Sequence, residues 1–188
     1  MGPVSDEDTT VLIVDDETDL LEAYELMLAD AYNVVTAANG DEALEAMHDE
    51  IDVVFLDRRM PGMSGDELLD ELREQGYGVP VAMVTAVEPD DDIIEMPFDD
   101  YLTKPVNREL LSNKVEILAN RASFDQKSRE FYRLASKKAT LEAKDTFDHT
   151  ESGEYQRLVD HMEELRADLD ETLDELVAED PEAAFRSL

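Results

Sequence analysis

Five short apolar runs divide the first hundred residues of the chain. Most of their residues are hydrophobic and many are β-branched, as is typical of parallel strands buried on both faces. The runs are residues 11–14, 34–35, 53–56, 81–84 and 101–103. Hydrophobic residues at three- and four-residue spacing, the helical pattern, follow the first three runs over 20–28, 42–47 and 68–72. This alternation predicts an α/β fold: a doubly wound, five-stranded parallel sheet with helices on both faces.

The segment between the fourth and fifth runs departs from this alternation. Only 18 residues separate Thr85 from Lys104, and the stretch 88–97 contains two prolines and five acidic residues. Proline inside a helix removes a backbone donor and clashes with the preceding turn. We therefore expect no more than a short helical turn here.

The pattern changes again after about Asn107. Helix-forming residues run to about Lys144, a polar stretch over 145–153 predicts a turn, and a last helix is expected over 154–178. Hydrophobic residues at heptad spacing form a seam along this last helix, with one polar break at Thr172. The seam consists of Tyr155, Leu158, Met162, Leu165, Leu169, Thr172 and Leu176. We expect a helical hairpin or coiled-coil region, with its helices paired within one chain or with a second copy.

Three parts follow from these patterns. We expect a flexible N-terminus over 1–8, an α/β domain over 9–120 and a helical region over 121–188. The acidic N-terminus lacks the basic and then apolar pattern of a signal peptide, and no apolar run reaches the roughly 18 residues of a membrane helix. The chain is therefore expected to be soluble and cytoplasmic, with no membrane partner.

Charge is the strongest feature of the composition. The chain carries 49 acidic and 16 basic residues, a net charge of -33, yet 43% of it is hydrophobic, which opposes a disordered chain. A folded protein with a carboxylate-rich surface needs salt to screen its self-repulsion, so we expect a halophilic protein from a salt-rich cytoplasm. Net charge is -25 over 1–112, +4 over 113–144 and -12 over 145–188. An N-terminal half this acidic disfavours nucleic-acid binding there.

Chemically useful residues stand where four of the predicted strands end. They are Asp15-Asp16, Asp57, Thr85 and Lys104. The carboxyl ends of parallel strands share one edge of a sheet, so these side chains are expected to converge. Neighbouring carboxylates require a compensating cation, and oxygen ligands without histidine or cysteine favour Mg²⁺, or else Mn²⁺. A lysine and a hydroxyl beside them predict a site in which a carboxylate attacks phosphorus and forms an acyl phosphate.

Four sequence strings around these residues resemble the receiver domain of bacterial and archaeal response regulators. The strings are VLIVDDE (11–17), FLDRRMPGMSG (55–65), VTA (84–86) and DYLTKP (100–105). Together they are specific, and the resemblance covers residues 9–118. It implies a flavodoxin-like fold and a phosphorelay in which a sensor histidine kinase donates the phosphoryl group. It also implies a protein that phosphorylates itself and is not a turnover enzyme on a separate substrate.

The resemblance also implies a role for each site residue. Asp57 matches the phospho-acceptor and, with Asp16, binds Mg²⁺ directly, whereas Asp15 acts largely through water. Arg59 matches the residue whose backbone carbonyl completes the metal shell. Arg58 and Arg59 also place unusual positive charge at the rim of the site, which is expected to affect the lifetime of the phosphate.

A second group of residues matches the phosphate-binding and switching part of the receiver site. Thr85 corresponds to the hydroxyl that turns toward the phosphoryl oxygen, and Lys104 to the lysine that pairs with the phosphate. The Lys104–Pro105 peptide is cis in this family. Tyr101 matches the aromatic rotamer switch, although a plain core aromatic is nearly as good a reading of that residue.

The helical region carries a weaker resemblance. The string FYRLASKKATLE (131–142) is similar to the HalX domain, which follows receivers in halophilic archaea, and the match covers about 113–180. Family names suggest a role in transcription. Two output mechanisms stay open: binding of DNA or the transcription machinery, or a protein-interaction or dimerisation module without DNA binding. No helix-turn-helix pattern is present, and the basic residues of this region are better read as a solvated helix face.

A third class of protein, the haloacid dehalogenase phosphatases, also uses an aspartyl nucleophile. That family places a second acid two residues after the nucleophile, and here Arg59 occupies the position. This class is therefore disfavoured.

Overall fold

The computed structural model describes residues 9–89, 94, 96–142 and 153–179. The expected flexible N-terminus and nearly all of the expected turn over 145–153 lie outside these ranges. The described residues divide into two compact units, one within residues 9–119 and one within residues 120–179. Each unit is described by itself.

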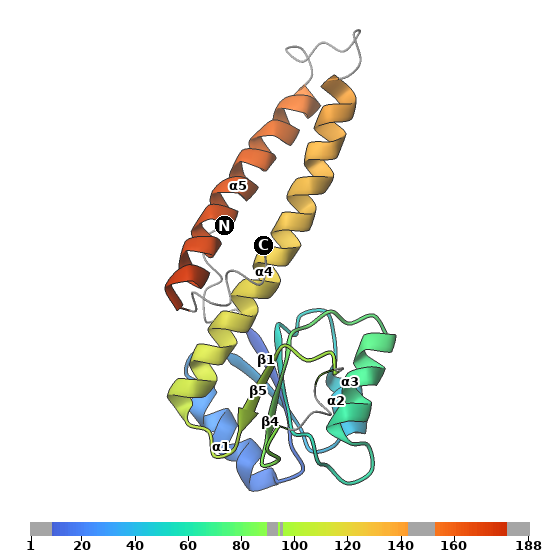
Figure 1. Ribbon diagram of the computed structural model, residues 1–188, viewed down its shortest axis with the longest axis vertical. Helices are drawn as coiled ribbons and strands as arrows, with labels where there is room; N and C mark the ends of the chain where they lie inside the picture. The colour runs from blue at the N-terminus through green and yellow to red at the C-terminus, as the bar shows by residue number, and fades with distance from the viewer. Residues whose placement is uncertain (1–8, 90–93, 95, 143–152, 180–188) are drawn as a thin grey trace. The chain divides into compact units, whose positions relative to one another are not determined.

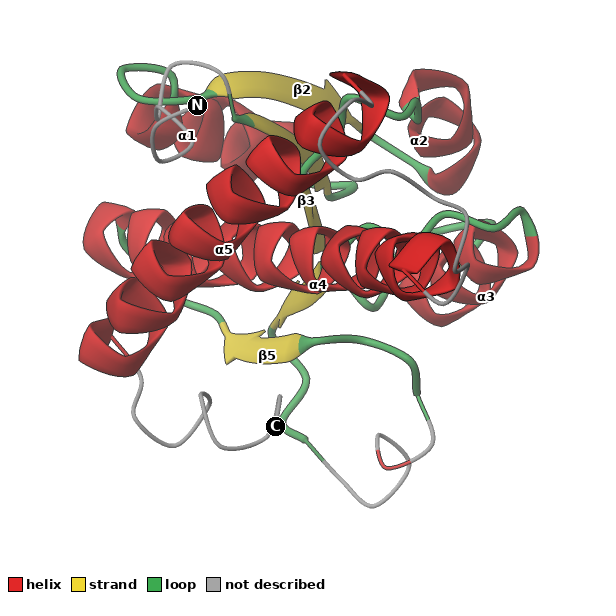
Figure 2. Cartoon of the chain, turned by 90° about the horizontal axis from the view of Figure 1, so that it is seen from above, coloured by secondary structure: helices red, strands yellow, loops and turns green. Residues whose placement is uncertain are grey.

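The first unit is built on a five-stranded parallel sheet in the order β2-β1-β3-β4-β5. β2 and β5 form its two edges (Figure 2). The strands are β1 Thr10–Val14, β2 Asn33–Ala37, β3 Val53–Leu56, β4 Val81–Thr85 and β5 Asp100–Thr103. All four strand pairings are parallel, so the predicted doubly wound sheet is confirmed.

Helices cover both faces of this sheet, with α1 on one side and α2 and α3 on the other (Figure 1). The helices are α1 Thr18–Leu28, α2 Gly40–Ala46, α3 Gly65–Glu74 and α4 Arg108–Glu142. The alternation of side chains along each strand produces two separate hydrophobic clusters. Ile13 and Phe55 pack with residues of α1 and the first turns of α4, whereas Leu12 and Leu56 pack with residues of α2 and α3.

The segment between β4 and β5 contains no α-helix among its described residues, as its prolines predict. Its end is held by Arg73 of α3. The Arg73 guanidinium donates hydrogen bonds to the carbonyl oxygens of Val79 at 2.8 Å, Tyr77 at 3.0 Å and Pro97 at 3.1 Å. It also lies 3.5 Å from the Asp99 carboxylate, which accepts a hydrogen bond from the Val81 amide at 2.8 Å. One cation therefore ties the entry into β5 to the start of β4.

The second unit contains residues 120–142 of α4 and the helix α5, Gly153–Glu179. Three contacts show that these helices run antiparallel. Going up α4, Lys127 pairs with Asp168, Glu130 with His161, and Glu142 with Tyr155, so the partner's number falls as the α4 number rises. The two helices form a hairpin within one chain.

The start of α3 fixes the loop that follows β3. Ser64 and Glu67 form a capping box, in which the Ser64 side chain accepts from the Glu67 amide and the Glu67 side chain accepts from the Ser64 amide. This geometry places Gly65 against the backbone of the strand end. A Cβ atom at Gly65 would lie 2.9 Å from the Arg58 Cα and closer still to the Asp57 carbonyl oxygen.

We predict that Gly65→Ala destabilises the first unit, although alanine normally favours a helix over glycine. The methyl group collides with backbone atoms that cannot rotate away, and overpacking of this kind costs about 1–3 kcal/mol. Urea denaturation measures the change. Gly78→Ala is the matched control, because a Cβ at Gly78 meets nothing within 4 Å. Equal stability of the two variants would contradict the prediction.

Candidate functional site

Two buried carboxylates and one lysine meet at the carboxyl edge of the sheet. Asp15 follows β1 and is 2% exposed, and Asp57 follows β3 and is 6% exposed. The Lys104 Nζ, arriving from the end of β5, lies 2.6 Å from Asp15 Oδ2 and 3.2 Å from Asp57 Oδ1. One ammonium therefore neutralises part of the repulsion between two carboxylates that come from separate strands.

Backbone hydrogen bonds fix the second oxygen of each carboxylate. Asp15 Oδ1 accepts from the Glu17 amide at 3.0 Å, and Asp57 Oδ2 accepts from the Arg59 amide at 2.9 Å. The Lys104 amide donates to the Thr85 carbonyl at 2.8 Å, which places the lysine beside β4. The Lys104–Pro105 peptide bond is cis. Both acids and the lysine are thus positioned by main-chain contacts.

Competing effects act on the pKa of Lys104. Burial alone lowers that pKa, because the charged form loses hydration. The hydrogen bonds and negative charges of Asp15 and Asp57 outweigh burial, and the net result is a pKa above the usual lysine value. Lys104 is therefore charged at neutral pH despite its 12% side-chain exposure.

The remaining predicted residues occupy different positions around this centre. Thr85 is 1% exposed at the end of β4, whereas the Asp16 side chain is exposed. No hydrogen bond or ion pair joins Asp16 to Asp15, Asp57 or Lys104. Within the described part of the chain, no three acidic or histidine side chains are grouped closely enough for one metal ion. The structure thus brings together Asp15, Asp57 and Lys104, and leaves Asp16 at their solvent side.

Thr85 and Tyr101 are connected through the backbone of Val87. The Thr85 hydroxyl oxygen accepts a hydrogen bond from the Val87 amide at 3.4 Å, and the Tyr101 hydroxyl donates to the Val87 carbonyl at 2.8 Å. The Tyr101 ring also packs on Phe98, with ring centroids 5.7 Å apart. The two residues that the resemblance pairs in switching therefore contact the same residue.

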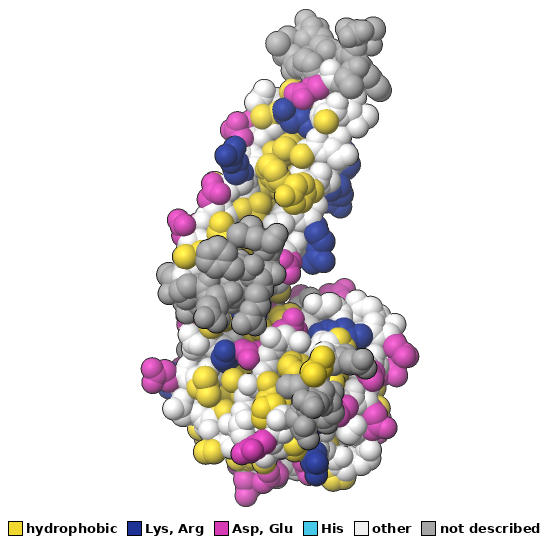
Figure 3. Space-filling model, in the orientation of Figure 1, with side chains coloured by type: hydrophobic (Ala, Val, Ile, Leu, Met, Phe, Trp, Pro, Cys, Tyr) yellow, Lys and Arg dark blue, Asp and Glu magenta, His cyan; other side chains and the backbone are white. Residues whose placement is uncertain are grey.

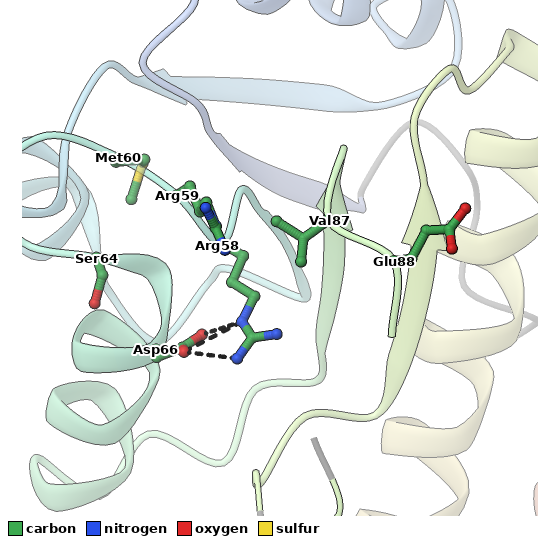
Figure 4. A pocket seen from close by; sticks show the side chains of 7 residues that line it. All are labelled: Arg58, Arg59, Met60, Ser64, Asp66, Val87 and Glu88. Carbon is green, nitrogen blue, oxygen red and sulfur yellow. Dashed lines mark hydrogen bonds and ion pairs between the residues drawn. The ribbon is translucent and has the colours of Figure 1, made fainter. Parts of the chain in front are cut away.

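A pocket of about 390 Å³ opens beside the site, lined by residues of the β3–α3 loop, α3 and the segment after β4. Figure 4 shows Arg58 extended across it toward Asp66 of α3, with Val87 on the other side. The Arg58 Nε lies 3.1 Å from Asp66 Oδ1 and 3.2 Å from Oδ2. Asp66 thereby neutralises the Arg58 charge, whereas Arg59 is exposed. Sequence reasoning missed this pair, and the opposite charges eight residues apart across a Pro-Gly loop are the only signal for it.

Comparison with known proteins identifies both parts of the chain. The response regulator receiver domain model matches residues 11–116. The chain belongs to the response regulator receiver family. The HalX domain model matches residues 120–185, so the receiver is followed by a HalX domain, as the two resemblances predict.

Relatives extend these matches. A Haloferax volcanii protein named "Putative transcriptional regulator" is 44% identical over 159 residues, which cover 84% of this chain and 27% of that protein. The Escherichia coli transcriptional regulatory protein CpxR is 33% identical over 123 residues, or 63% of this chain and 53% of CpxR. A Thermotoga maritima cyclic di-GMP phosphodiesterase is 32% identical over 136 residues, 37% of its length. The chain thus spans between a quarter and about half of these relatives.

Solved structures share the fold of the first unit. The CheY-like receiver domain protein of Methanospirillum hungatei is 29% identical with a TM-score of 0.56, over 60% of this chain and 94% of that one. A Francisella receiver domain is 30% identical with a TM-score of 0.55, over 61% of this chain and 98% of that one. In the described residues, no helix is both long and apolar enough to span a membrane.

We predict that Lys104→Met destabilises the protein by about 3 kcal/mol at neutral pH, because two buried carboxylates lose their shared cation. Urea denaturation in molar KCl measures the loss. The double variant Asp15→Asn, Lys104→Met should recover part of the stability, since it removes one of the uncompensated charges. A double variant less stable than the single one would contradict this account.

Alkaline pH provides a second check on the same interaction. Folding raises the pKa of Lys104. The contribution of the charged lysine to the free energy of unfolding is therefore complete below the ordinary lysine pKa of 10.5, and it is lost as pH rises through the higher pKa of the folded state. The stability difference between wild type and Lys104→Met should therefore narrow above pH 10.5 and not below it.

Proposed function

We propose that this chain is a phosphorelay response regulator that accepts a phosphoryl group on Asp57 from a sensor histidine kinase and passes the signal to its HalX region. The observation that supports the proposal is the contact of the Lys104 ammonium with two buried carboxylates, Asp15 and Asp57. All three lie at the carboxyl edge of a sheet with the receiver-family fold. A pocket lies beside this edge, lined in part by Arg58 and Arg59, the two residues that follow Asp57.

The transfer itself needs a free carboxylate oxygen and a place for new negative charge. An oxygen of Asp57 forms the bond to phosphorus as the phosphorus–nitrogen bond of a phosphohistidine breaks, and the leaving imidazole takes up a proton. Lys104 then lies beside a dianionic phosphoryl group instead of a carboxylate alone. The Lys104 backbone amide is hydrogen-bonded to the Thr85 carbonyl, which holds the lysine at this edge of the sheet. From there its positive charge suits it to pair with a phosphoryl oxygen.

The donor set fits a hard divalent cation, because it consists of carboxylate and carbonyl oxygens without sulfur or imidazole. Asp15, Asp16, Asp57 and the Arg59 carbonyl would hold Mg²⁺, or Mn²⁺ in its place. When bound, the ion neutralises charge on the transferring phosphoryl oxygens. Asp16 would join this set from the solvent side, because its side chain is exposed whereas Asp15 and Asp57 are buried.

Switching follows from the shared contact at Val87. A phosphoryl oxygen on Asp57 would accept a hydrogen bond from the Thr85 hydroxyl and turn it away from the Val87 amide, whose hydrogen bond to the hydroxyl oxygen is long at 3.4 Å. When Thr85 turns, the Val87 peptide loses one of its two contacts, and the Tyr101 hydroxyl bond to the Val87 carbonyl couples that change to β5. Contacts of about 1 kcal/mol each are enough to shift a two-state equilibrium several-fold.

For the HalX region we propose output through protein contacts that regulate transcription, and not through direct binding of DNA. The helix α5 carries ten acidic and two basic residues, so its field repels phosphates. Several basic residues of α4 are already paired: Lys127 with Asp168, and Lys138 with Glu142. The relatives named as transcriptional regulators support a role in transcription, but they do not distinguish protein contacts from DNA binding.

We predict that Asp57→Asn abolishes phosphorylation by acetyl phosphate in the presence of Mg²⁺, because the amide cannot act as the nucleophile. Intact-mass spectrometry detects the added phosphoryl group. Asp49→Asn is the matched control, since Asp49 is an exposed aspartate away from the sheet edge, and it should label like wild type. Undiminished labelling of Asp57→Asn would refute the assignment.

We also predict that the phosphorylated chain of 188 residues shows no retention on double-stranded DNA in molar KCl, measured by co-sedimentation. The acidic surface repels the duplex, and the salt removes what attraction the basic residues offer. DNA retention that depends on phosphorylation would favour the direct DNA-binding mechanism instead. That outcome would leave the Asp57 assignment untouched.

A further inference from the structure

The helical unit carries apolar side chains that its own two helices do not cover. Among the side chains of 120–142 and 153–179 whose exposure is described, only Leu165 and Thr172 are buried. Tyr132 is 73% exposed and Val177 is 47% exposed. The two antiparallel helices therefore leave part of their hydrophobic surface in water, and a contiguous surface of this kind is typical of an interaction site.

In α4, two parallel seams explain this exposure. One seam faces α5, as the Lys127–Asp168 pair shows, and it continues through Phe131, Leu134, Lys138 and Leu141. A second seam consists of the residues that directly follow those of the first seam in the sequence, and its residues are apolar or small. It consists of Ser128, Tyr132, Ala135 and Ala139. One residue is a rotation of about 100° on a helix, so the second seam lies on the adjacent face.

The helix α5 repeats this arrangement. Its first seam contains Leu165 and Thr172, which are buried, and Leu158. One position after each of these come Val159, Arg166 and Leu173, and Val177 continues the series. Val159 and Leu173 are half-buried and Val177 is exposed. Both helices thus have a partly uncovered seam displaced in the same rotational sense from the seam that pairs them, and the α5 seam is apolar except at the exposed Arg166.

The antiparallel arrangement puts these two seams on one side of the hairpin. Both helices are right-handed, so the displacement runs clockwise on one helix and anticlockwise on its antiparallel neighbour when both are viewed from the same end. The two seams therefore open onto a single face. In Figure 3, hydrophobic side chains gather along the visible side of α4 and α5, between flanking basic and acidic residues.

We propose that this face, formed by Tyr132, Ala135, Ala139, Val159, Leu173 and Val177, binds the same face of a second copy of the chain to form a four-helix bundle. The inference goes beyond the proposed phosphorelay function and does not depend on phosphorylation. Exposed tyrosine and valine beside two alanines give a surface on which large side chains of one copy meet small ones of the other.

Charge selects the second copy over other occupants. Residues 120–142 carry a net charge of +3, whereas α5 carries -8. With a two-fold axis along the bundle, every helix is antiparallel to both neighbours, and each α4 lies between the α5 of its own chain and that of its partner. Basic helices then alternate with acidic ones. Nucleic acid or an anionic membrane would instead meet the charge of α5 with repulsion.

Sedimentation equilibrium of the full chain in molar KCl tests the proposal. Wild type should be a dimer, and the variant Tyr132→Glu, Ala135→Glu should dissociate at least about ten-fold more readily, because charges enter the apolar centre. The control Gln126→Glu, Thr140→Glu adds the same charge to exposed positions on the far side of α4 and should stay dimeric. A monomeric wild type, or equal dissociation of the two variants, overturns the proposal.

A second measurement keeps the test independent of any folding defect in the glutamate variant. The chain has no cysteine, so a single introduced thiol reports its own surroundings. Ala135→Cys should be linked into covalent dimers by a short bismaleimide, and Gln126→Cys on the outer side should not. Equal linking of both, or of neither, counts against the four-helix bundle.

Discussion

The receiver site depends on the electrostatic balance between two buried carboxylates and one ammonium. Asp15 and Asp57 come from strands that are neighbours in the sheet, and each is almost fully removed from solvent. Without a cation their ionised forms could not both persist there. Lys104 supplies that charge from β5, across β4, so the balance joins three strands at their ends. The same ammonium is the group that we propose pairs with a phosphoryl group on Asp57.

Much of this site was predictable because a parallel sheet converts sequence position into spatial position. Hydrophobic runs that end at Asp15 and Asp57 must place those residues at one edge, and the position of Lys104 after the fifth run adds the cation. The boundaries of β3 agree with the pattern, as do the two long helices to within two residues. The absence of a described α-helix between β4 and β5 follows from its prolines.

The contacts that escaped prediction all cross loops. The Arg58–Asp66 pair depends on the turn taken between β3 and α3, which the capping box of Ser64 and Glu67 sets. Hydrophobic periodicity carries no information about such turns. The uncovered seam of α4 escaped notice for a different reason: alanine and serine at helical spacing are ordinary in any helix. Whether these residues are exposed depends on which face of α4 packs against α5, and the sequence does not state that.

Because Arg73 anchors the chain near both ends of β4 and its connection to β5, the position of the site need not depend on the length of that connection. Its guanidinium holds the Val79 carbonyl, which lies before β4, and the Pro97 carbonyl, which lies near the end of the connection, and so ties the start of β4 to the point where the chain returns toward β5. Changes in length after the end of β4 and before Pro97 are therefore expected to leave unaltered the β4–β5 register that delivers Lys104. A chain built in this way is free to remodel one of its outer surfaces while the sheet edge that carries Asp15, Asp57 and Lys104 stays the same.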